Sequence, residues 1–256
     1  MAFLKVNGIH HTYFTKKSKT TALSDISFHV GEGEFISILG PSGCGKTTLL
    51  SIIAGLIKPT DGSVTLGDQP VEKGKNNIGY MLQQDYLFPW KTIEENILLG
   101  LKLNNELTPP KKEKTFNLLE KIGLLEFQKS YPHELSGGMR QRAALVRTLA
   151  TDPKVLLLDE PFSSLDYQTK LRLEDLVFAT LKSFRKTAIL VTHDIGEAIA
   201  MSDRVFLFSP RPGRLYKIFE MPKELTSISP FEARNHEYFS TIFQTIWKEL
   251  EEIEGG

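Results

Sequence analysis

The sequence has one cysteine, no excess of charge of either sign and no long hydrophobic run. Because Cys44 is the only cysteine among 256 residues, an intrachain disulfide is excluded and a reducing compartment is favoured. Lysine plus arginine and aspartate plus glutamate number 31 each, which gives a formal net charge of zero. A dedicated nucleic-acid-binding protein would be basic. The charge balance therefore argues against nucleic acid as a partner.

The sequence also lacks a segment that could cross a bilayer or direct export. Residues 1–10 have no apolar core of signal-peptide length. The longest apolar runs, 155–158 and 188–191, are far shorter than the roughly 20 residues of a membrane span. We therefore expect a soluble, cytoplasmic protein that reaches a membrane only through a partner.

Short apolar strands alternate with longer helical stretches, and no internal repeat interrupts them. Strands are predicted at 34–39, 64–66, 78–82, 155–158 and 187–191, and helices at about 46–56, from 138 onward and at 170–184. The order strand, helix, strand indicates parallel βαβ units and hence an α/β fold. Between 92 and 125 the spacing is helical, with a break at 108–110. We expect residues from about 84 to 150 to form a helical lobe inserted in the core.

A helix is also predicted at the C-terminus, over 230–256. Ser229 can cap it, Pro230 suits its first position, and Glu232 lies where a capping box needs it. Apolar side chains then recur at helical spacing, at Phe239, Ile242, Phe243, Ile246, Trp247, Leu250 and Ile253. The favoured interpretation is a helix that packs on its own domain, and the alternative is a docking surface for a partner.

A glycine-rich loop lies between the first predicted strand and helix. It matches the phosphate-loop pattern G-x-x-x-x-G-K-[ST] and reads Gly40-Pro41-Ser42-Gly43-Cys44-Gly45-Lys46-Thr47. Glycines allow successive backbone N–H groups to point at phosphate oxygens, and the following helix directs its positive end at the same anion. Lys46 adds a charge for the β- and γ-phosphates, and Thr47 a hydroxyl for Mg²⁺. The loop therefore predicts nucleotide binding, with Cys44 as a small filler residue.

Two carboxylates follow the apolar strand at 155–158. Asp159 is placed to hold Mg²⁺ through water, and Glu160 to orient or deprotonate a water that attacks the γ-phosphate. The alternative, a strand that simply ends in solvated acids, is weak beside a phosphate loop. To this point the sequence indicates a P-loop ATPase or GTPase.

A second glycine-rich segment narrows this choice. Leu135-Ser136-Gly137-Gly138-Met139-Arg140-Gln141-Arg142 resembles the signature motif of the ATP-binding-cassette (ABC) family. The resemblance covers about residues 4–208. It implies a P-loop NTPase core of mainly parallel sheet with an N-terminal antiparallel β part, and we take 1–229 as the ATPase domain. In that family the signature of one subunit closes on ATP held by the phosphate loop of another. The resemblance therefore implies a dimer, either of identical chains or with a close relative.

Other segments resemble further motifs of the family in the expected order. Gln83, or its neighbour Gln84, is similar to the Q-loop glutamine, which contacts Mg²⁺ or water and senses the permease. The segment Ser163-Ser164-Leu165-Asp166 resembles the D-loop, which communicates across the dimer. His193 resembles the switch histidine, which can contact the γ-phosphate and position Glu160.

Tyr13 resembles the aromatic residue that stacks on adenine, with Phe14 as the alternative. The resemblance thus implies three catalytic residues, Glu160, His193 and Gln83, and ATP and Mg²⁺ as cofactors. The implied metal ligands are Thr47, Gln83 and Asp159. The implied ATP-binding residues are Tyr13, Gly40, Pro41, Ser42, Gly43, Cys44, Gly45, Lys46, Thr47, Thr48, Ser136, Gly137, Gly138 and Asp166.

Three details resemble import subunits for nitrate, sulfonates and taurine. They are the segment 85–90, the segment 209–214 and the short C-terminal helix in place of a long regulatory domain. Importers of pyrimidine or thiamine precursors look alike here, so the transported solute stays open. Leu87, Phe88 and Trp90 either help to form a groove for a permease helix or pack within the helical lobe.

The resemblance implies permease subunits as partners, an extracytoplasmic solute-binding protein indirectly, and a peripheral position on the cytoplasmic face of the cell membrane. An ABC exporter or lipoprotein-extraction ATPase is one alternative. A ribosome-associated or DNA-repair ATPase is another, although a single signature and the lack of a long coiled coil argue against them. A third is a nucleotide-binding regulator without turnover, which would show no hydrolysis dependent on Glu160.

Overall fold

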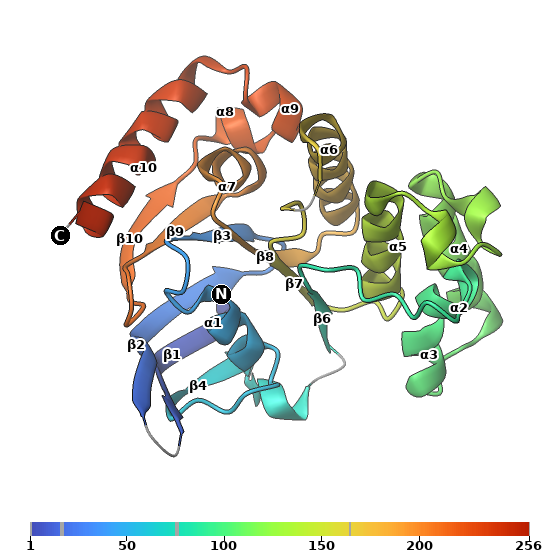
Figure 1. Ribbon diagram of the computed structural model, residues 1–256, viewed down its shortest axis with the longest axis horizontal. Coiled ribbons are helices and arrows are strands. Elements are labelled where there is room, and N and C mark those ends of the chain that lie inside the picture. Colours follow the sequence, from blue (N-terminus) through green and yellow to red (C-terminus); the bar gives the residue numbers. More distant parts are fainter. Residues whose placement is uncertain (1, 16–17, 75–76, 164, 256) are drawn as a thin grey trace.

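The computed structural model describes residues 2–15, 18–74, 77–163 and 165–255 (Figure 1). The strands are β1 (Ala2–Phe14), β2 (Lys19–Gly31), β3 (Phe35–Leu39), β4 (Asp61–Leu66), β5 (Gln69–Pro70), β6 (Ile78–Met81), β7 (Val155–Asp159), β8 (Thr187–Thr192), β9 (Arg204–Phe208) and β10 (Leu215–Glu220). The α-helices are α1 (Lys46–Ile53), α2 (Ile93–Ile97), α3 (Leu99–Leu103), α4 (Pro109–Lys121), α5 (Gly137–Leu149), α6 (Tyr167–Ser183), α7 (Ile195–Met201), α8 (Lys223–Thr226), α9 (Pro230–Ala233) and α10 (Glu237–Gly255). Single 3-10 turns are η1 (Val71–Lys73), η3 (Leu125–Phe127) and η4 (Pro132–Glu134).

A six-stranded sheet forms the centre, in the order β10-β9-β3-β8-β7-β6. All neighbouring strands are parallel except β10 and β9, which are antiparallel. Every residue of β3, β7 and β8 is buried, which explains why these strands are mostly apolar without alternating apolar and polar residues. Along β7, Val155 and Leu157 face one core while Leu156 and Leu158 face another, as the two-residue period of a strand requires. The predicted parallel α/β core is confirmed.

The N-terminal strands form a second sheet, in the order β2-β1-β4-β5 with antiparallel pairs. Its apolar face packs over α1 and one face of the central sheet, where side chains such as Leu4, Ile26 and Leu49 share one core with Val191. The helix α1 therefore lies between the two sheets (Figure 1). This arrangement agrees with the predicted antiparallel β part, and it places β1 and β2 next to the phosphate loop.

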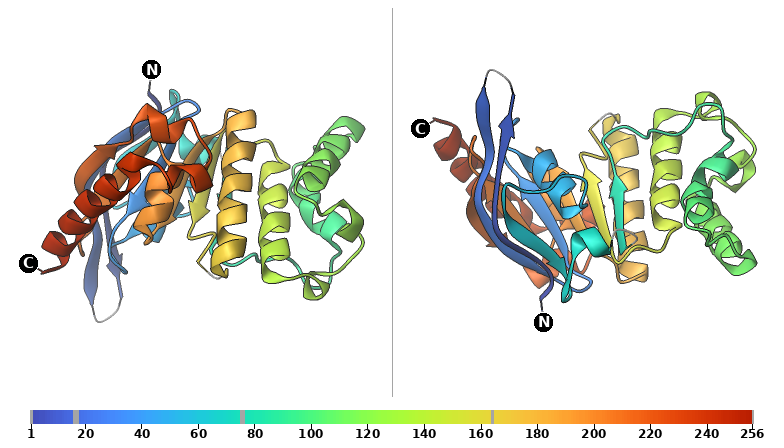
Figure 2. Two further views of the ribbon diagram at one scale, coloured as in Figure 1. Left: turned by 90° about the horizontal axis from the view of Figure 1, so that it is seen from above. Right: turned by 90° about the horizontal axis from the view of Figure 1, so that it is seen from below.

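Helices α2 to α5 project from the opposite side of the central sheet (Figures 1 and 2). Figure 2 shows α6 between the sheet and α5, with α2 to α4 beyond. The predicted break before α4 arises because Thr108 caps this helix and proline occupies its first two positions. Thr92 caps α2 through a capping box with Glu95. Leu87 is buried in the core of this region, whereas the side chain of Trp90 is 70% exposed. Of the two alternatives for Leu87, packing within the helical lobe is therefore confirmed, and an exposed groove position is excluded.

The C-terminal segment contains two helices in place of one continuous helix. The predicted capping box of Ser229 and Glu232 is present, but α9 ends after a single turn. Turn-type hydrogen bonds from the backbone N–H groups of Asn235 and His236 to carbonyls three residues earlier close it, and α10 follows. In α10, Ile246 is fully buried against the core that includes α7 and β9. The helix packs on its own domain, as favoured. Among the described residues, no helix combines the length and apolarity that a membrane span requires.

Candidate nucleotide-binding site

The phosphate loop joins the carboxyl end of β3 to the start of α1. Two of its glycines have positive φ angles, 76° at Gly43 and 103° at Gly45, which residues with a side chain rarely adopt. A Cβ atom at Gly45 would lie 2.7 Å from Leu23 Cδ2 and 2.9 Å from the carbonyl oxygen of Ala22. The glycines therefore serve both the curvature of the loop and its close approach to β2.

Lys46 turns its side chain back into the loop. It is buried, and its Nζ atom donates to the carbonyl oxygens of Gly40 at 2.7 Å and Pro41 at 2.9 Å. The ammonium group also lies 3.8 Å from Cys44 Sγ. Burial raises the pKa of the Cys44 thiol, although the nearby Lys46 charge opposes the shift. The loop thus holds one positive charge at its centre, next to a thiol kept in its neutral form.

Thr47 and Asp159 meet at the ends of α1 and β7. The Thr47 hydroxyl donates to Asp159 Oδ1 at 3.1 Å, and Tyr80 donates its hydroxyl to Asp159 Oδ2 at 3.2 Å. Burial raises the pKa of Asp159, while these two hydrogen bonds act in the opposite direction. Burial likewise raises the pKa of Tyr80. Tyr80 was not among the sequence candidates, because the strand order that sets β6 beside β7 is what brings its hydroxyl to Asp159.

Glu160 and His193 follow the neighbouring strands β7 and β8. His193 Nδ1 lies 3.1 Å from Glu160 Oε2, within hydrogen-bonding distance. Glu160 has a φ angle of 46°, an uncommon conformation for a residue with a side chain, and its N–H donates to the carbonyl oxygen of Val191. This backbone bond fixes the turn after β7, so that the carboxylate faces the histidine. The predicted pair is brought together.

Gln83 lies just beyond β6, and its side chain joins the segment that follows Glu160. Its Nε2 atom donates to Ser163 Oγ at 3.1 Å, and that hydroxyl donates to the carbonyl oxygen of Glu160 at 3.0 Å. Its own carbonyl oxygen accepts from Gln141 Nε2 on α5 at 3.0 Å. Gln83 therefore links α5 to the turn after β7, and no hydrogen bond joins its side chain to Thr47 or Asp159 in the described part of the chain.

Tyr13, at the end of β1, lies beside the start of α1. Its hydroxyl and that of Thr48 are 3.2 Å apart, and its ring meets the His11 ring edge-on with centroids 4.5 Å apart. Tyr13 is 42% exposed and lines the same cavity as the phosphate loop. Phe14, the alternative, is 69% exposed and lies outside that lining. The geometry favours Tyr13 as the residue available to a ligand.

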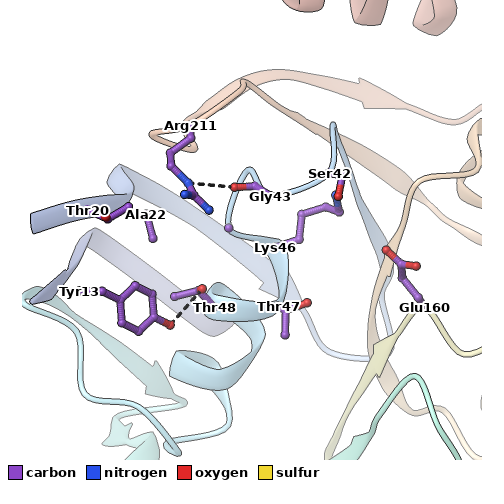
Figure 3. A pocket seen from close by; sticks show the side chains of 11 residues that line it. Tyr13, Thr20, Ala22, Ser42, Gly43, Lys46, Thr47, Thr48, Glu160 and Arg211 are labelled. Atoms are coloured by element: carbon purple, nitrogen blue, oxygen red, sulfur yellow. Dashed lines mark hydrogen bonds between the residues drawn. The ribbon is translucent and has the colours of Figure 1, made fainter. Parts of the chain in front are cut away.

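These elements surround one open cavity of about 310 Å³ (Figure 3). The lining residues are Tyr13, Thr20, Ala22, Ser42, Gly43, Gly45, Lys46, Thr47, Thr48, Glu160 and Arg211. Thr20 and Ala22 line the cavity because β2, to which they belong, pairs with β1 beside Tyr13. Arg211 was not singled out from the sequence as a site residue. Its only available signal was its place in the segment 209–214, which the structure lays against the phosphate loop.

The signature residues lie elsewhere in the chain. Ser136 caps α5 by accepting from the N–H of Met139 at 3.3 Å, and a Cβ atom at Gly138 would lie 2.6 Å from Thr169 Cγ2 on α6. Ser136 and Gly138 line a separate cavity of about 470 Å³ between α5, α6 and the end of α4. Asp166 caps α6 by accepting from the N–H of Thr169 at 3.0 Å, and this bond lowers the pKa of Asp166.

Ser164, within the predicted D-loop, lies outside the described residues. Gly137 follows Ser136 as the first residue of α5. Within this chain, therefore, neither Ser136 nor Gly138 shares the cavity of the phosphate loop.

Comparison with known proteins agrees with this geometry. The profile of the ABC transporter family matches residues 23–163. The uncharacterized ABC transporter ATP-binding protein YtlC of Bacillus subtilis (strain 168) is 63% identical over 99% of this chain and 98% of its own length. The aliphatic sulfonates import ATP-binding protein SsuB of Bacillus cereus (strain ATCC 10987 / NRS 248) is 42% identical, covering 90% of this chain and 92% of its own. The taurine import ATP-binding protein TauB of Roseobacter denitrificans is 39% identical, with coverage of 92% and 90%.

Solved structures give the same answer. The ATP-binding cassette MJ0796, in its dimeric post-hydrolysis state bound to ADP and Pi, superposes with a TM-score of 0.76 and 31% identity. The match covers 86% of this chain and 99% of that one. The phosphate loop, the carboxylates at the end of β7 and these similarities together show that the chain belongs to the ABC transporter family, as an ATP-binding subunit with ATPase activity.

Proposed function

We propose that this chain hydrolyses ATP to energise the import of a small solute, of the sulfonate, nitrate, taurine or vitamin-precursor kind, through a membrane permease. Support for the solute class comes from SsuB and TauB, relatives that match about nine-tenths of the chain and carry import of sulfonates and taurine in their names. The single observation that carries the ATPase mechanism is the gathering of Lys46, Thr47 and Glu160 around one cavity.

In this proposal the triphosphate of ATP lies in the phosphate loop, with adenine on Tyr13. Lys46 exchanges its carbonyl partners for phosphate oxygens, which as anions are the stronger acceptors. The free N–H groups at the start of α1 add hydrogen bonds and the positive end of the helix dipole. Thr48, beside the Tyr13 hydroxyl, and the loop residues Gly40 to Gly45 complete this part of the site.

The residues present also suit a magnesium ion. Thr47 and Asp159 place two oxygen donors 3.1 Å apart, and oxygen is the ligand atom that Mg²⁺ prefers. Gln83 could join them only by leaving its hydrogen bond with Ser163. When bound, Mg²⁺ would neutralise charge on the phosphate oxygens as the γ-phosphate leaves. Among the described residues, no cluster of three or more histidine, cysteine or acidic residues forms a competing site.

Glu160 acts as the general base in this proposal. Its carboxylate accepts a proton from the water that attacks the γ-phosphate, and His193 holds the carboxylate through the 3.1 Å contact. Because the turn after β7 is fixed by the bond to Val191, the base is placed before the substrate arrives. Such preorganisation lowers the cost of reaching the transition state.

The separation of the two glycine-rich motifs supports a head-to-tail dimer. In one chain, Ser136 and Gly138 lie apart from the phosphate-loop cavity, so they would need a second subunit's nucleotide to bind phosphate. MJ0796 is known as a dimeric cassette. A homodimer beneath the permease subunits, which in turn receive solute from an extracytoplasmic solute-binding protein, is the assembly we propose, at the cytoplasmic face of the membrane. The exposed Trp90, near the ring of Phe88 at 5.4 Å, is available to the permease.

Uptake measurements test the proposal. Cells of the organism from which the protein comes are prepared with either the wild-type protein or the Glu160→Gln variant. Each culture is then given labelled sulfonates, taurine, nitrate, bicarbonate and pyrimidine vitamins, and the uptake of each compound is measured. Loss of uptake of one compound in the variant supports import and names the solute. If purified wild-type protein hydrolyses ATP but no uptake changes, an exporter or a non-transport ATPase becomes the better assignment. If ATPase activity did not depend on Glu160, the proposed role of Glu160 as the general base would be wrong.

A further inference from the structure

The segment 209–214 is fixed against the phosphate loop by its backbone. The N–H of Gly213 donates to the carbonyl oxygen of Ala22 at 2.9 Å, and the carbonyl oxygen of Gly213 accepts from Ser24 at 3.0 Å. A Cβ atom at Gly213 would lie 2.0 Å from the carbonyl oxygen of Cys44, so only glycine permits this approach. Ser209 also braces the segment, since its hydroxyl accepts from the N–H of Arg214 at 3.1 Å. The position of this segment is therefore set relative to the phosphate loop.

Arg211 extends from this segment over the loop. Its Nε atom donates to the carbonyl oxygen of Gly43 at 3.2 Å, while the residue as a whole is exposed. A guanidinium group has five N–H donors. Within the described residues, the carbonyl oxygen of Gly43 is the only hydrogen-bond acceptor of the Arg211 side chain. The two terminal nitrogens, with four N–H groups, thus stay available to a ligand in the cavity that Arg211 lines.

Charge in the cavity is arranged unevenly. Among the lining residues, Lys46 and Arg211 are cations and Glu160 is the anion. Figure 3 shows Arg211 on the side of Thr20 and Ala22, with Glu160 at the opposite side. Tyr13 lies on the same side as Thr20, its partner across β1 and β2. The second positive charge therefore lies away from the reacting γ-phosphate and toward the end where the nucleoside is expected.

We propose that Arg211 is a nucleotide-binding residue, and that its terminal nitrogens donate to phosphate oxygens in the part that ADP and ATP share. A planar guanidinium with two parallel donors suits a phosphate better than a point charge does. This inference rests on the proposed placement of the nucleotide in the phosphate-loop cavity. It adds a contact from the segment 209–214 to a cavity whose other lining residues all precede residue 161.

The test is the affinity of the full chain for Mg-ADP and Mg-ATP, measured by titration calorimetry at two salt concentrations. Arg211→Gln removes the charge but keeps an N–H donor for Gly43. We expect both nucleotides to bind about 10- to 100-fold more weakly, as for the loss of one charge-assisted hydrogen bond. The salt dependence of binding should also decrease. Arg211→Lys should recover part of the affinity.

Arg214→Gln is the matched control, because Arg214 belongs to the same segment but does not line the cavity. It should bind both nucleotides like wild type. The thermal midpoint of the nucleotide-free protein should be the same in all three variants and wild type.

Three results would overturn the inference. Unchanged ADP affinity in Arg211→Gln would exclude a contact with the shared phosphates. A loss for ATP but not for ADP would assign Arg211 to the γ-phosphate. A lower thermal midpoint together with weaker binding, not recovered by Arg211→Lys, would assign it to the structure of the loop. Lys46→Ala separates this from the broader proposal, since normal ADP binding by that variant would show that the nucleotide does not occupy this cavity at all.

Discussion

A buried contact between the Glu174 carboxyl group on α6 and Arg234, which follows α9, should make the stability of the protein depend on pH in an unusual direction. The Glu174 side chain is fully buried, and its Oε2 atom lies 2.6 Å from Arg234 Nη1. The pKa of Glu174 is raised from 4.5 to about 7, because burial, the largest cause, and the neighbouring charge of Glu197 together outweigh the opposing charges of Arg234 and Lys170. The folded protein therefore retains a proton on Glu174 at pH values where the unfolded chain has lost it.

The sign of the effect follows from the proton balance. Between pH 4.5 and about 7 the folded state binds more protons than the unfolded state, so the free energy of unfolding falls as pH rises. One pKa unit corresponds to about 1.4 kcal/mol, so the shift of Glu174 amounts to about 3 kcal/mol across this window. Below pH 4.5 the contribution is fully present, and above about pH 7 it is lost.

Urea unfolding at pH 5, 6, 7 and 8 measures this term as a difference between wild type and Glu174→Gln. Glutamine keeps the shape of the side chain but cannot ionise, so the pH-dependent loss should be absent from the variant. Shifts of distant groups, such as Asp159, are common to both proteins and cancel in the difference. Glu113→Gln, a change on the exposed face of α4, should follow wild type. Stability curves of wild type and Glu174→Gln that run parallel from pH 5 to 8 would refute the reasoning.

Three further changes probe the nucleotide site. Glu160→Gln should lower the rate of ATP hydrolysis by at least about 100-fold, while ATP still binds and promotes an ATP-dependent dimer seen by gel filtration; hydrolysis at the wild-type rate would remove Glu160 as the base. Tyr13→Ala should weaken binding of ADP by about 5- to 10-fold without affecting that of inorganic pyrophosphate, and an equal loss for both would argue against stacking on adenine. Gly213→Ala should lower both the thermal midpoint and nucleotide affinity, because its Cβ atom would meet the Cys44 carbonyl oxygen; an unchanged midpoint would show that the segment can move away.

Local sequence patterns predicted those parts of the fold in which one signal dominates. The strands β7 and β8 are buried on both faces, and each contains an apolar run, at 155–158 and 188–191. These runs predicted both strands at the correct place in the chain. The break at Thr108 likewise marks the start of α4, because capping and proline chemistry act within a few residues. The prediction of one continuous C-terminal helix was wrong in extent. The turn at Asn235 and His236 depends on local backbone hydrogen bonds, which the spacing of apolar residues does not encode.

In the candidate site, too, local motifs predicted some contacts, whereas others depend on the tertiary structure. The contact of Thr47 with Asp159 was expected from the phosphate loop and the acidic end of a strand, and that of Glu160 with His193 from the family resemblance. Arg211 and Tyr80 reach the site through strand order and through the packing of the segment 209–214 on β2. The two alternatives for Leu87 stayed open in the sequence because an apolar residue in a loop does not reveal which side faces the interior. The positions of Arg211, Tyr80 and Leu87 depend on their neighbours in the tertiary structure, which local sequence patterns do not reveal.

The burial of Cys44 has a consequence for how the protein tolerates oxidising conditions. A thiol must ionise before it reacts with peroxides, disulfides or alkylating agents. Cys44 is 1% exposed, and burial raises its pKa, so both the reactive form and access to it are restricted. The chain therefore carries its only thiol in the loop proposed to bind ATP, and we expect reagents to react with it slowly. Energy supply to transport should accordingly persist through an oxidative challenge that inactivates enzymes with exposed thiolates.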